Sequence, residues 1–509
     1  MEEVPELIIT QKESLLTMVC RYLTTEKIKA YLVGGAVRDM LLNRETADID
    51  IAVNSDALET ASTISQQTGG VFVLLDEANR IGRVVIKDTD NGKHWNFDFS
   101  SLRGNIEQDL AERDFTVNAL AIDLDSIADK KPCFYGLLRE LVDLPVIDPF
   151  DGQSDLQRGI IRAVSRRVFI ADPARLLRAV RLMAELDFII DGDTESLIKQ
   201  YAALASTIAG ERVHEEILRL LAVPGSGRLL RDLDDLGILM VLIPELEPAR
   251  NTTQPKEHHW NVLDHSLNVA VAIEYLLHQG SWLYENEGIL SAVPWSPQLD
   301  AHFHNEVGYS STRLSLLKIA AVLHDVSKPD TKTVNEDGKM RFLGHDRQGA
   351  EKAVRILERM RFSTREIRLV ELYIHYHLRP TQLTHENLPS RRALYRYFRD
   401  TGDAALDVLF LSLADHLATR GPLVEPELWQ EHAKLVEYVI SQYYNTEELV
   451  SPPKLIDGHD LITLFNLKPG PRVGEFLEAA REAQASGEIS NREQALDYIR
   501  RILKDRTGK

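Results

Sequence analysis

The sequence has only two cysteines, Cys20 and Cys133, among 509 residues. Two thiols exclude a disulfide framework and a metal site built from cysteines. The chain also lacks any apolar run near the roughly 20 residues that cross a bilayer, so no contact with a membrane is expected. Its first residues, MEEVPELIITQKES, are acidic and lack the basic-then-apolar order of a signal peptide. We therefore expect a cytoplasmic protein.

Positive charge is scarce as well. The sequence has 59 Lys and Arg residues against 78 Asp and Glu residues, which gives a net charge of −19. Taken alone, this balance argues against nucleic-acid binding, because contacts to phosphate need Lys and Arg. The arginines are nevertheless concentrated in a stretch at 158–181 and in clusters at 355–368 and 391–399. Such clusters either bind a polyanion or lie on solvated helix faces beside acids, and both alternatives stay open for the last two.

The length predicts three or four domains. Five short strands are expected near the N-terminus, with a helix among them at 37–42; the strands are at 30–33, 49–53, 71–75, 83–86 and 95–99. From about residue 155 the apolar spacing is helical, as at 174–186, 213–221 and 227–236. The segment 244–257 resembles a linker, and 282–312 an irregular insert. We predict an α+β head with a small mixed sheet (1–145), followed by an all-α neck (146–250), an all-α domain (255–430) and a helical tail (431–509).

The segment YLVGGAVRDMLLNRETADIDIAV, at 31–53, combines two features of a phosphate site. Asp48 and Asp50 alternate along a strand, so they share a face and would repel each other without a cation such as Mg²⁺. Two such ions can activate a hydroxyl and stabilise a leaving pyrophosphate. Gly34-Gly35 follows a strand and opens a helix, where backbone N–H groups can cradle phosphate, and Arg38 adds a charge. The alternative is a polar loop between strands.

Two later segments contain charged residues that allow simpler interpretations. In ERDFTVNALAID (112–123), Arg113 and Asp114 are either functional or a local ion pair next to an apolar strand. In ADPARLLRAVRLMAELDF (171–188), Asp172 and Arg175 share a helix face. They equally suit a helix cap followed by an arginine in solvent. Asp98 is either a third carboxylate near the metals or an exposed strand residue.

In combination, these segments resemble the signature of the class II tRNA nucleotidyltransferases, the family of CCA-adding enzymes and bacterial poly(A) polymerases. The resemblance implies template-independent transfer of CMP or AMP from CTP or ATP to the 3′ end of tRNA, with A-adding or poly(A) polymerase activity as the alternative. It assigns nucleotide-binding roles to Gly34, Gly35, Arg38, Arg113, Asp114, Asn118, Asp172, Arg175 and Arg178. Two positions depart from the pattern: Glu112 replaces an arginine, and Ala171 replaces a glutamate next to the base-reading pair. The choice between C and A therefore stays open.

Histidines and carboxylates recur through the third predicted domain in a pattern that suits transition metals. A single such histidine would normally be a core or surface residue, but His324 and Asp325 are adjacent at the end of an apolar helix, with Lys328 nearby to meet a phosphate. The order resembles that of the HD-domain phosphohydrolases, which implies a divalent metal at His265, His324, Asp325, His345, His377 and Asp415. A chain that acts mainly as such a hydrolase, on RNA ends or nucleotides, is a further alternative.

Two expectations complete the prediction. We interpret His258 and His259 as loop residues rather than metal ligands. The segment after Pro452-Pro453 resembles the tail that follows the HD domain in these enzymes, which implies contact with tRNA. The sequence leaves the oligomeric state open.

Overall fold

The computed structural model of the chain describes residues 15–44, 46–87, 94–128, 145–286, 288–308, 310–383, 388–450 and 452–507. Cys133 lies outside the described residues. The chain divides into two compact units, Met1–Ile208 and Ala209–Lys509, which are described separately. Within the described part of the chain, no helix has both the length and the apolar character needed to cross a bilayer.

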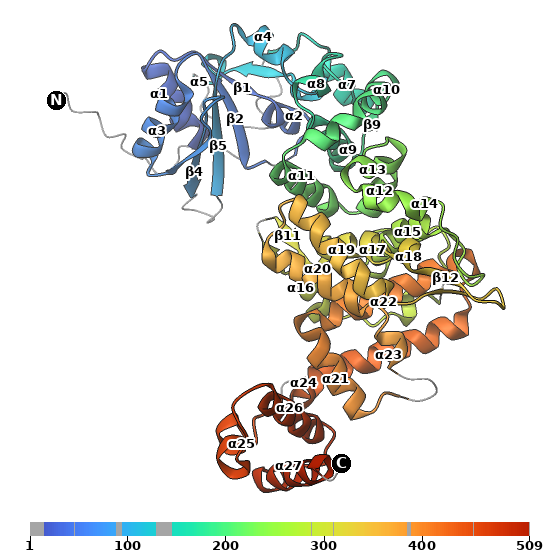
Figure 1. Cartoon of the computed structure of the whole chain (residues 1–509). Helices are drawn as coiled ribbons and strands as arrows, with labels where there is room; N and C mark the ends of the chain where they lie inside the picture. The colour runs from blue at the N-terminus through green and yellow to red at the C-terminus, as the bar shows by residue number, and fades with distance from the viewer. Residues whose placement is uncertain are drawn as a thin grey trace. The chain divides into compact units, whose positions relative to one another are not determined.

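A seven-stranded mixed sheet organises the first unit, in the order β3-β4-β5-β2-β1-β6-β7 (Figure 1). Its strands are β1 (Ala30–Val33), β2 (Asp48–Val53), β3 (Val71–Asp76), β4 (Ile81–Lys87), β5 (His94–Ser101), β6 (Ala121–Asp123) and β7 (Val146–Ile147). β2 pairs with β5 in parallel, and the other neighbours are antiparallel. Alternation explains the strands: Trp95, Phe97 and Phe99 of β5 are buried, while the residues between them are less so. The predicted mixed sheet is confirmed.

Helices complete the first unit. Those around the sheet are α1 (Leu15–Thr25), α2 (Gly35–Leu41), α3 (Ala57–Thr68), α4 (Ile106–Ala111), η1 (Thr116–Asn118) and α5 (Asp125–Ala128). They are followed by α7 (Gly152–Arg158), α8 (Val168–Ala171), α9 (Arg175–Leu186), α10 (Gly192–Tyr201) and η3 (Ala202–Thr207). A short parallel pair, β8 (Ile160–Ile161) with β9 (Ile189–Ile190), lies among these helices and was not predicted. Two residues per strand are too few for periodicity to show.

The second unit is helical. Its first part contains α11 (Gly210–Ala222), α12 (Ser226–Asp235), α13 (Leu239–Leu242), η4 (Pro244–Leu246), α14 (Glu247–Arg250) and α15 (Val262–Leu276). The next part contains η5 (Leu290–Ala292), α16 (Pro297–His304), α17 (Arg313–Leu323), α18 (Lys328–Thr331), α19 (His345–Arg359) and α20 (Thr364–Tyr376). It continues with η6 (Pro380–Gln382), α21 (Arg391–Thr401), η7 (Gly402–Ala404), α22 (Ala405–Arg420), η8 (Gly421–Leu423), α23 (Pro426–Asn445) and α24 (Glu447–Val450). Two short hairpins interrupt the helices: β10 (Glu306–Gly308) with β11 (Ser311–Thr312), and β12 (Lys332–Val334) with β13 (Met340–Phe342).

The centre of this unit is formed by α15, α17 and α22, whose side chains are buried along most of their length. Every residue of α17 is buried, including Lys318, whose ammonium lies 2.5 Å from Glu274 Oε1 on α15. The last three helices, α25 (Gly458–Phe465), α26 (Pro471–Ala485) and α27 (Arg492–Thr507), gather at the C-terminal end of the chain (Figure 1). The predicted succession of an α+β head and helical regions is therefore confirmed.

Two expectations about irregular segments are wrong in part. The segment predicted as a linker at 244–257 begins with η4 and α14, and only its remainder is a loop. The segment predicted as an irregular insert at 282–312 contains α16 and the hairpin of β10 and β11. Both errors have one cause: proline suits the first turn of a helix, and Pro244 and Pro297 occupy that position here.

Candidate functional site

The carboxylates of β2 lie at the centre of the first candidate site. Asp48 is exposed, whereas Asp50 is partly buried and opposite Asp98 of β5 in the parallel register. Burial raises the pKa of Asp50 to about 6; Arg113 opposes this shift, and Asp98 and Asp48 add to it. A carboxyl group in such a position is stabilised in its ionised form by a further cation. The oxygen ligands and the excess negative charge fit Mg²⁺.

Asp98 belongs to this cluster but is held by a partner of its own. Both of its oxygens accept hydrogen bonds from the guanidinium of Arg83, each at 2.7 Å. The side chain is 18% exposed, so the interpretation of Asp98 as an exposed strand residue is wrong. Arg83 was not singled out by its sequence context, because its pairing depends on the antiparallel register of β4 with β5.

Gly34 brings the backbone close to these charged groups. Its φ of +70° favours glycine, and a Cβ atom there would lie 2.5 Å from Arg113 Nη1 and 3.3 Å from Asp50 Oδ2. The three residues come from the turn before α2, from β2 and from the turn after α4, and they converge on one point. Arg113 is also held by Asp109 Oδ2, 3.3 Å from its Nη2. The site thus places a cation beside a partly buried carboxylate, where only a glycine leaves room.

A hydrogen-bonded chain connects α2 with α9. Arg38 donates to both oxygens of Asp39 and, through Nη1 at 2.7 Å, to Asn118 Oδ1. Asn118 in turn donates to Asp114 Oδ1 at 3.0 Å, and Arg178 Nη1 lies 3.2 Å from Asp114 Oδ2. Burial opposes ionisation of Asp114, but Arg178 and the hydrogen bonds lower the pKa of its carboxyl group below the ordinary value. Asp114 is therefore not a local ion pair with Arg113, because its charged partner comes from α9.

Arg175 is fixed by main-chain carbonyl groups. Its Nη2 donates to Glu112 O at 2.8 Å, and its Nη1 lies 3.5 Å from Val168 O. The guanidinium is 3.8 Å from Asp172 Oδ2, while Asp172 Oδ1 accepts from Ala174 N at 3.1 Å. Arg175 is only 17% exposed, so its placement in solvent is wrong. The expected helix cap by Asp172 is also wrong, because the N-cap residue of α9 is Ala174 and no side chain caps this helix. Ala171 is exposed.

The arginine clusters have mixed surroundings. In the stretch 158–181, Arg162 and Arg181 form ion pairs with acids, whereas Arg166 and Arg167 are exposed. The clusters 355–368 and 391–399 are largely engaged with acidic side chains, as in the pairs Arg359–Glu245, Arg361–Glu211, Arg368–Glu371, Arg392–Glu482, Arg396–Glu482 and Arg399–Glu478. For these pairs, the alternative of helix faces beside neighbouring acids holds.

A second candidate site lies in the second unit. Six side chains meet there from α15, the end of α17, the start of α19, the end of α20 and α22: His265, His324, Asp325, His345, His377 and Asp415. Three overlapping groups of these residues have ligand atoms within 4.8 Å of one another. His265 Nε2 lies 3.0 Å from Asp415 Oδ1, and His345 Nε2 lies 3.4 Å from Asp325 Oδ1. The structure therefore brings together all six residues, which are up to 150 positions apart in the sequence.

The ring orientations in this cluster are those of metal ligands. The Nδ1 atoms of His324, His345 and His377 lie 2.6 to 2.8 Å from main-chain carbonyl oxygens three residues earlier, which leaves Nε2 as the unprotonated nitrogen. The Nε2 atoms of His265, His324 and His345 are buried and lie 3.0 to 3.4 Å from carboxylate oxygens of the cluster, without a hydrogen bond of good geometry among the described residues. Burial also lowers the pKa of His377 to about 4, so this ring is neutral at pH 7. The donor set fits a divalent transition metal.

Three side chains border this cluster. Lys328 Nζ lies 2.6 Å from Asp325 Oδ2 and donates to Gln254 Oε1 at 2.7 Å. The ring of His258 faces that of His265, with 5.7 Å between centroids. His258 lies in a loop, as predicted, but it is next to the metal ligands, which its sequence position did not indicate. Gln254 was likewise missed, because an amide in a polar segment carries no signal of its own.

Comparison with protein families assigns most of the chain. Residues 30–162 match the Poly A polymerase head domain, and 187–250 match an RNA and SrmB-binding site of polymerase A. Residues 262–420 match the HD domain, and 345–499 match tRNA nucleotidyltransferase domain 2. The carboxylates and glycines of the first site lie within the matched head domain, and the six residues of the second site lie within the matched HD domain.

Full-length relatives agree with these matches. The chain is 33% identical over 485 residues to an A-adding tRNA nucleotidyltransferase of Deinococcus radiodurans, covering 94% of this chain and 96% of that one. It is 32% identical over 481 residues to a CC-adding tRNA nucleotidyltransferase of Thermus thermophilus, with 92% and 93% covered. The fold resembles that of a Thermotoga maritima CCA-adding enzyme solved with tRNA, at a TM-score of 0.57, 21% identity and coverage of 96% and 95%. The chain belongs to the tRNA nucleotidyltransferase family and is a nucleotidyltransferase with an HD domain.

Proposed function

We propose that this enzyme transfers CMP or AMP from CTP or ATP to the 3′ end of tRNA without a template, to add or repair CCA. The observation that carries the proposal is the convergence of Gly34, Asp50 and Arg113 on one point of the head, in a member of this family. A nucleoside triphosphate needs an open backbone, a cation and metal-binding carboxylates close together. Those three features are what this point provides.

The proposed division of labour starts with Asp48 and Asp50, which hold Mg²⁺. When bound, the metal ions supply activation of the RNA 3′-hydroxyl and stabilisation of the departing pyrophosphate. Gly34 and Gly35 leave the backbone accessible to the phosphates, and Arg113 neutralises their charge. Asn118 and Asp114 contact the ribose.

Arg38 and Arg178 act as positioning residues in this proposal. Each holds one end of the Asn118–Asp114 pair, so the ribose contacts are fixed before the nucleotide binds. Asp172 and Arg175 read the base, with the guanidinium oriented by the carbonyl group of Glu112. Neutralising either positioning arginine is expected to raise KM more than it lowers kcat.

A second candidate is partial addition, either of the terminal A alone or of CC alone. It is favoured by two relatives that match this chain over more than nine-tenths of their own length, one an A-adding and one a CC-adding enzyme. Ala171 supports it from the structure, because an alanine has no carboxylate to move Arg175 between two base-pairing positions. Polymerisation of A without a limit is the remaining alternative within the family.

One assay separates these activities. The protein is incubated with Mg²⁺, labelled CTP or ATP, and tRNAs that end before, within and after the CCA sequence. Full CCA addition predicts CTP incorporation into the shortest tRNA and ATP incorporation into tRNA ending in CC, whereas a partial enzyme shows only one of the two. Asp50→Ala is expected to abolish incorporation. If Asp50→Ala incorporates as the wild type does, the proposed site is wrong.

The six-ligand cluster supports a second activity, metal-dependent hydrolysis of phosphate esters on RNA ends or nucleotides. Its buried Nε2 atoms suit a bound divalent metal, and Lys328 is placed to meet a substrate phosphate. Asp325→Ala should remove hydrolysis of a 2′,3′-cyclic phosphate at an RNA end and leave nucleotide incorporation nearly intact. Loss of both activities together would contradict the division into two sites.

The remaining expectations join this proposal. The boundaries proposed are a catalytic head at 1–145, a neck at 146–250, an HD domain at 255–430 and a tail at 431–509, with tRNA contacted by the neck and the tail. The exposed Arg166 and Arg167 are the neck residues best placed to meet phosphates. The reaction is expected in the cytoplasm, where tRNA and both nucleotides are present.

A further inference from the structure

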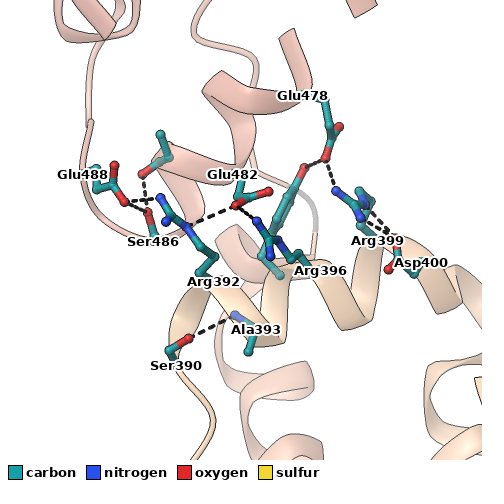
Figure 2. Close-up of polar contacts among 12 residues, drawn as sticks. Ser390, Arg392, Ala393, Arg396, Arg399, Asp400, Glu478, Glu482, Ser486 and Glu488 are labelled. Atoms are coloured by element: carbon teal, nitrogen blue, oxygen red, sulfur yellow. Dashed lines mark hydrogen bonds and ion pairs between the residues drawn. The ribbon is translucent and has the colours of Figure 1, made fainter. Parts of the chain in front are cut away.

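The contact between α21 and α26 is built from charged side chains. Figure 2 shows Arg392, Arg396 and Arg399 along one face of α21, directed toward the glutamates of the neighbouring segment. Arg396 pairs with Glu482 at 2.6 Å and Arg399 with Glu478 at 3.0 Å. We call this contact the latch, and it consists of Arg392, Arg396, Arg399, Glu478, Glu482 and Glu488.

The helices α25, α26 and α27 do not depend on the latch for folding. The helices α25, α26 and α27 enclose their own hydrophobic core, formed by Ile456, Leu461, Val473, Phe476, Ala480, Ala483, Ile489, Ala495 and Ile499. The less buried side chains packed on this core also come from the same segment, between Leu455 and Leu503. A module with its own core can separate from its neighbour without unfolding.

The arginines of the latch are accessible to water and ions, whereas their shared partner Glu482 is only 16% exposed. The arginines are 36 to 50% exposed, and ion pairs at that exposure are weak and screened by salt, with a Debye length of about 8 Å at physiological ionic strength. Tyr395 contributes a hydroxyl that donates to Glu478 Oε1 at 2.9 Å, which is again a polar contact. The interaction is therefore specific in geometry and easily exchanged for another anion.

We propose that the latch is a switch opened by RNA. In the enzyme without RNA, the glutamates of the α26 segment occupy the arginines of α21; when tRNA binds, backbone phosphates replace them and the C-terminal helices move away. Guanidinium groups bind carboxylate and phosphate with the same forked geometry, and a phosphate backbone also repels the displaced glutamates. The inference rests on the proposed function, because tRNA is the polyanion involved.

Fluorescence energy transfer in the full-length protein tests the switch. Dyes are attached at Glu437→Cys on α23 and at Lys468→Cys before α26, both exposed positions, with Cys133 replaced by alanine and the buried Cys20 retained. Transfer efficiency should fall when salt is raised or tRNA is added. Glu478→Gln combined with Glu482→Gln should give the low efficiency already in the absence of RNA, and should bind tRNA more tightly because no side chain competes.

A matched control removes the same charge elsewhere. Glu493→Gln with Asp497→Asn neutralises two acids of α27 outside the latch and should keep the wild-type response to salt and tRNA. The latch is refuted if the glutamine pair leaves transfer efficiency unchanged, or if tRNA leaves it unchanged in an enzyme that incorporates nucleotides. Loss of incorporation with an intact response to salt and to the glutamines would instead refute the proposed function.

Discussion

Replacement of the Asp50 carboxylate should raise the stability of the metal-free protein while it removes nucleotide incorporation. The pKa of Asp50 is about 6, which is above the ordinary value of 3.8. Between pH 3.8 and pH 6, the native state therefore holds a proton that the unfolded state has released. The difference corresponds to a penalty of about 3 kcal/mol in the metal-free protein above pH 6. Asp50→Asn removes the titrating group, so the variant should be more stable than the wild type by about this amount at pH 7.5. The stability advantage of Asp50→Asn should fall to about half at pH 5. The free-energy penalty in the wild type is lost as the pH decreases from about 6 toward 3.8.

The unfolding of the head can be followed through Cys20, a buried free thiol of α1. In a Cys133→Ala background, the rate of thiol labelling in increasing urea reports when this unit opens. Mg²⁺ should stabilise the wild type and not Asp50→Asn, since binding to the native state adds stability. Asp48→Asn, at an exposed carboxylate, serves as the control and should change stability by less than about 0.5 kcal/mol. A destabilised Asp50→Asn protein, or a difference independent of pH, would refute the reasoning.

Three further variants test other parts of the molecule. Gly34→Ala should destabilise the head by about 1–3 kcal/mol in urea unfolding and reduce incorporation, because φ is +70° and the new Cβ would clash. Gly35→Ala, whose Cβ would meet the Arg38 guanidinium at 3.5 Å in ordinary contact, should leave stability unchanged. Asp325→Asn should lower the divalent metal content measured by mass spectrometry and abolish the loss of thermal stability that a chelator causes in the wild type. Lys318→Met should cost about 3–5 kcal/mol in urea unfolding of the second unit, since it leaves Glu274 buried without its cation, and a loss below about 1 kcal/mol would contradict this.

Local patterns were sufficient for the elements that carry both sites. The strand β5 was predicted because its apolar residues alternate, and the helix before His324 because its apolar residues are continuous. Residue type then indicated candidate metal ligands, since histidine and carboxylate adjacent at a helix end have few structural uses. The sequence pattern did not show that these residues lie close together in space, because their proximity depends on how α15, α17 and α22 pack.

The sequence did not predict which charged side chains pair with one another. Arg83 was equivalent to any other arginine until the strand register placed Asp98 beside it. Arg38 was singled out for its charge, but its partner Asn118 was not foreseen. The cluster at 391–399 was ambiguous for the same reason, since its acidic partners lie about 90 positions away. A count of charges along the chain cannot distinguish an arginine that binds RNA from one that holds two helices together. Only the distances between side chains make that distinction.

Asp172 and Arg175, the pair proposed to read the base, show how a departure from a family pattern can be compensated. Ala171 removes the carboxylate that the resemblance places beside Arg175, yet the arginine is fixed here by the carbonyl groups of Glu112 and Val168. Carbonyl groups of the backbone cannot change rotamer as a glutamate side chain can. A guanidinium held in this way keeps one orientation, which is suited to one base rather than to two in succession. Under the second candidate function, addition of a single kind of nucleotide, Ala171→Glu should widen the choice between CTP and ATP in the incorporation assay.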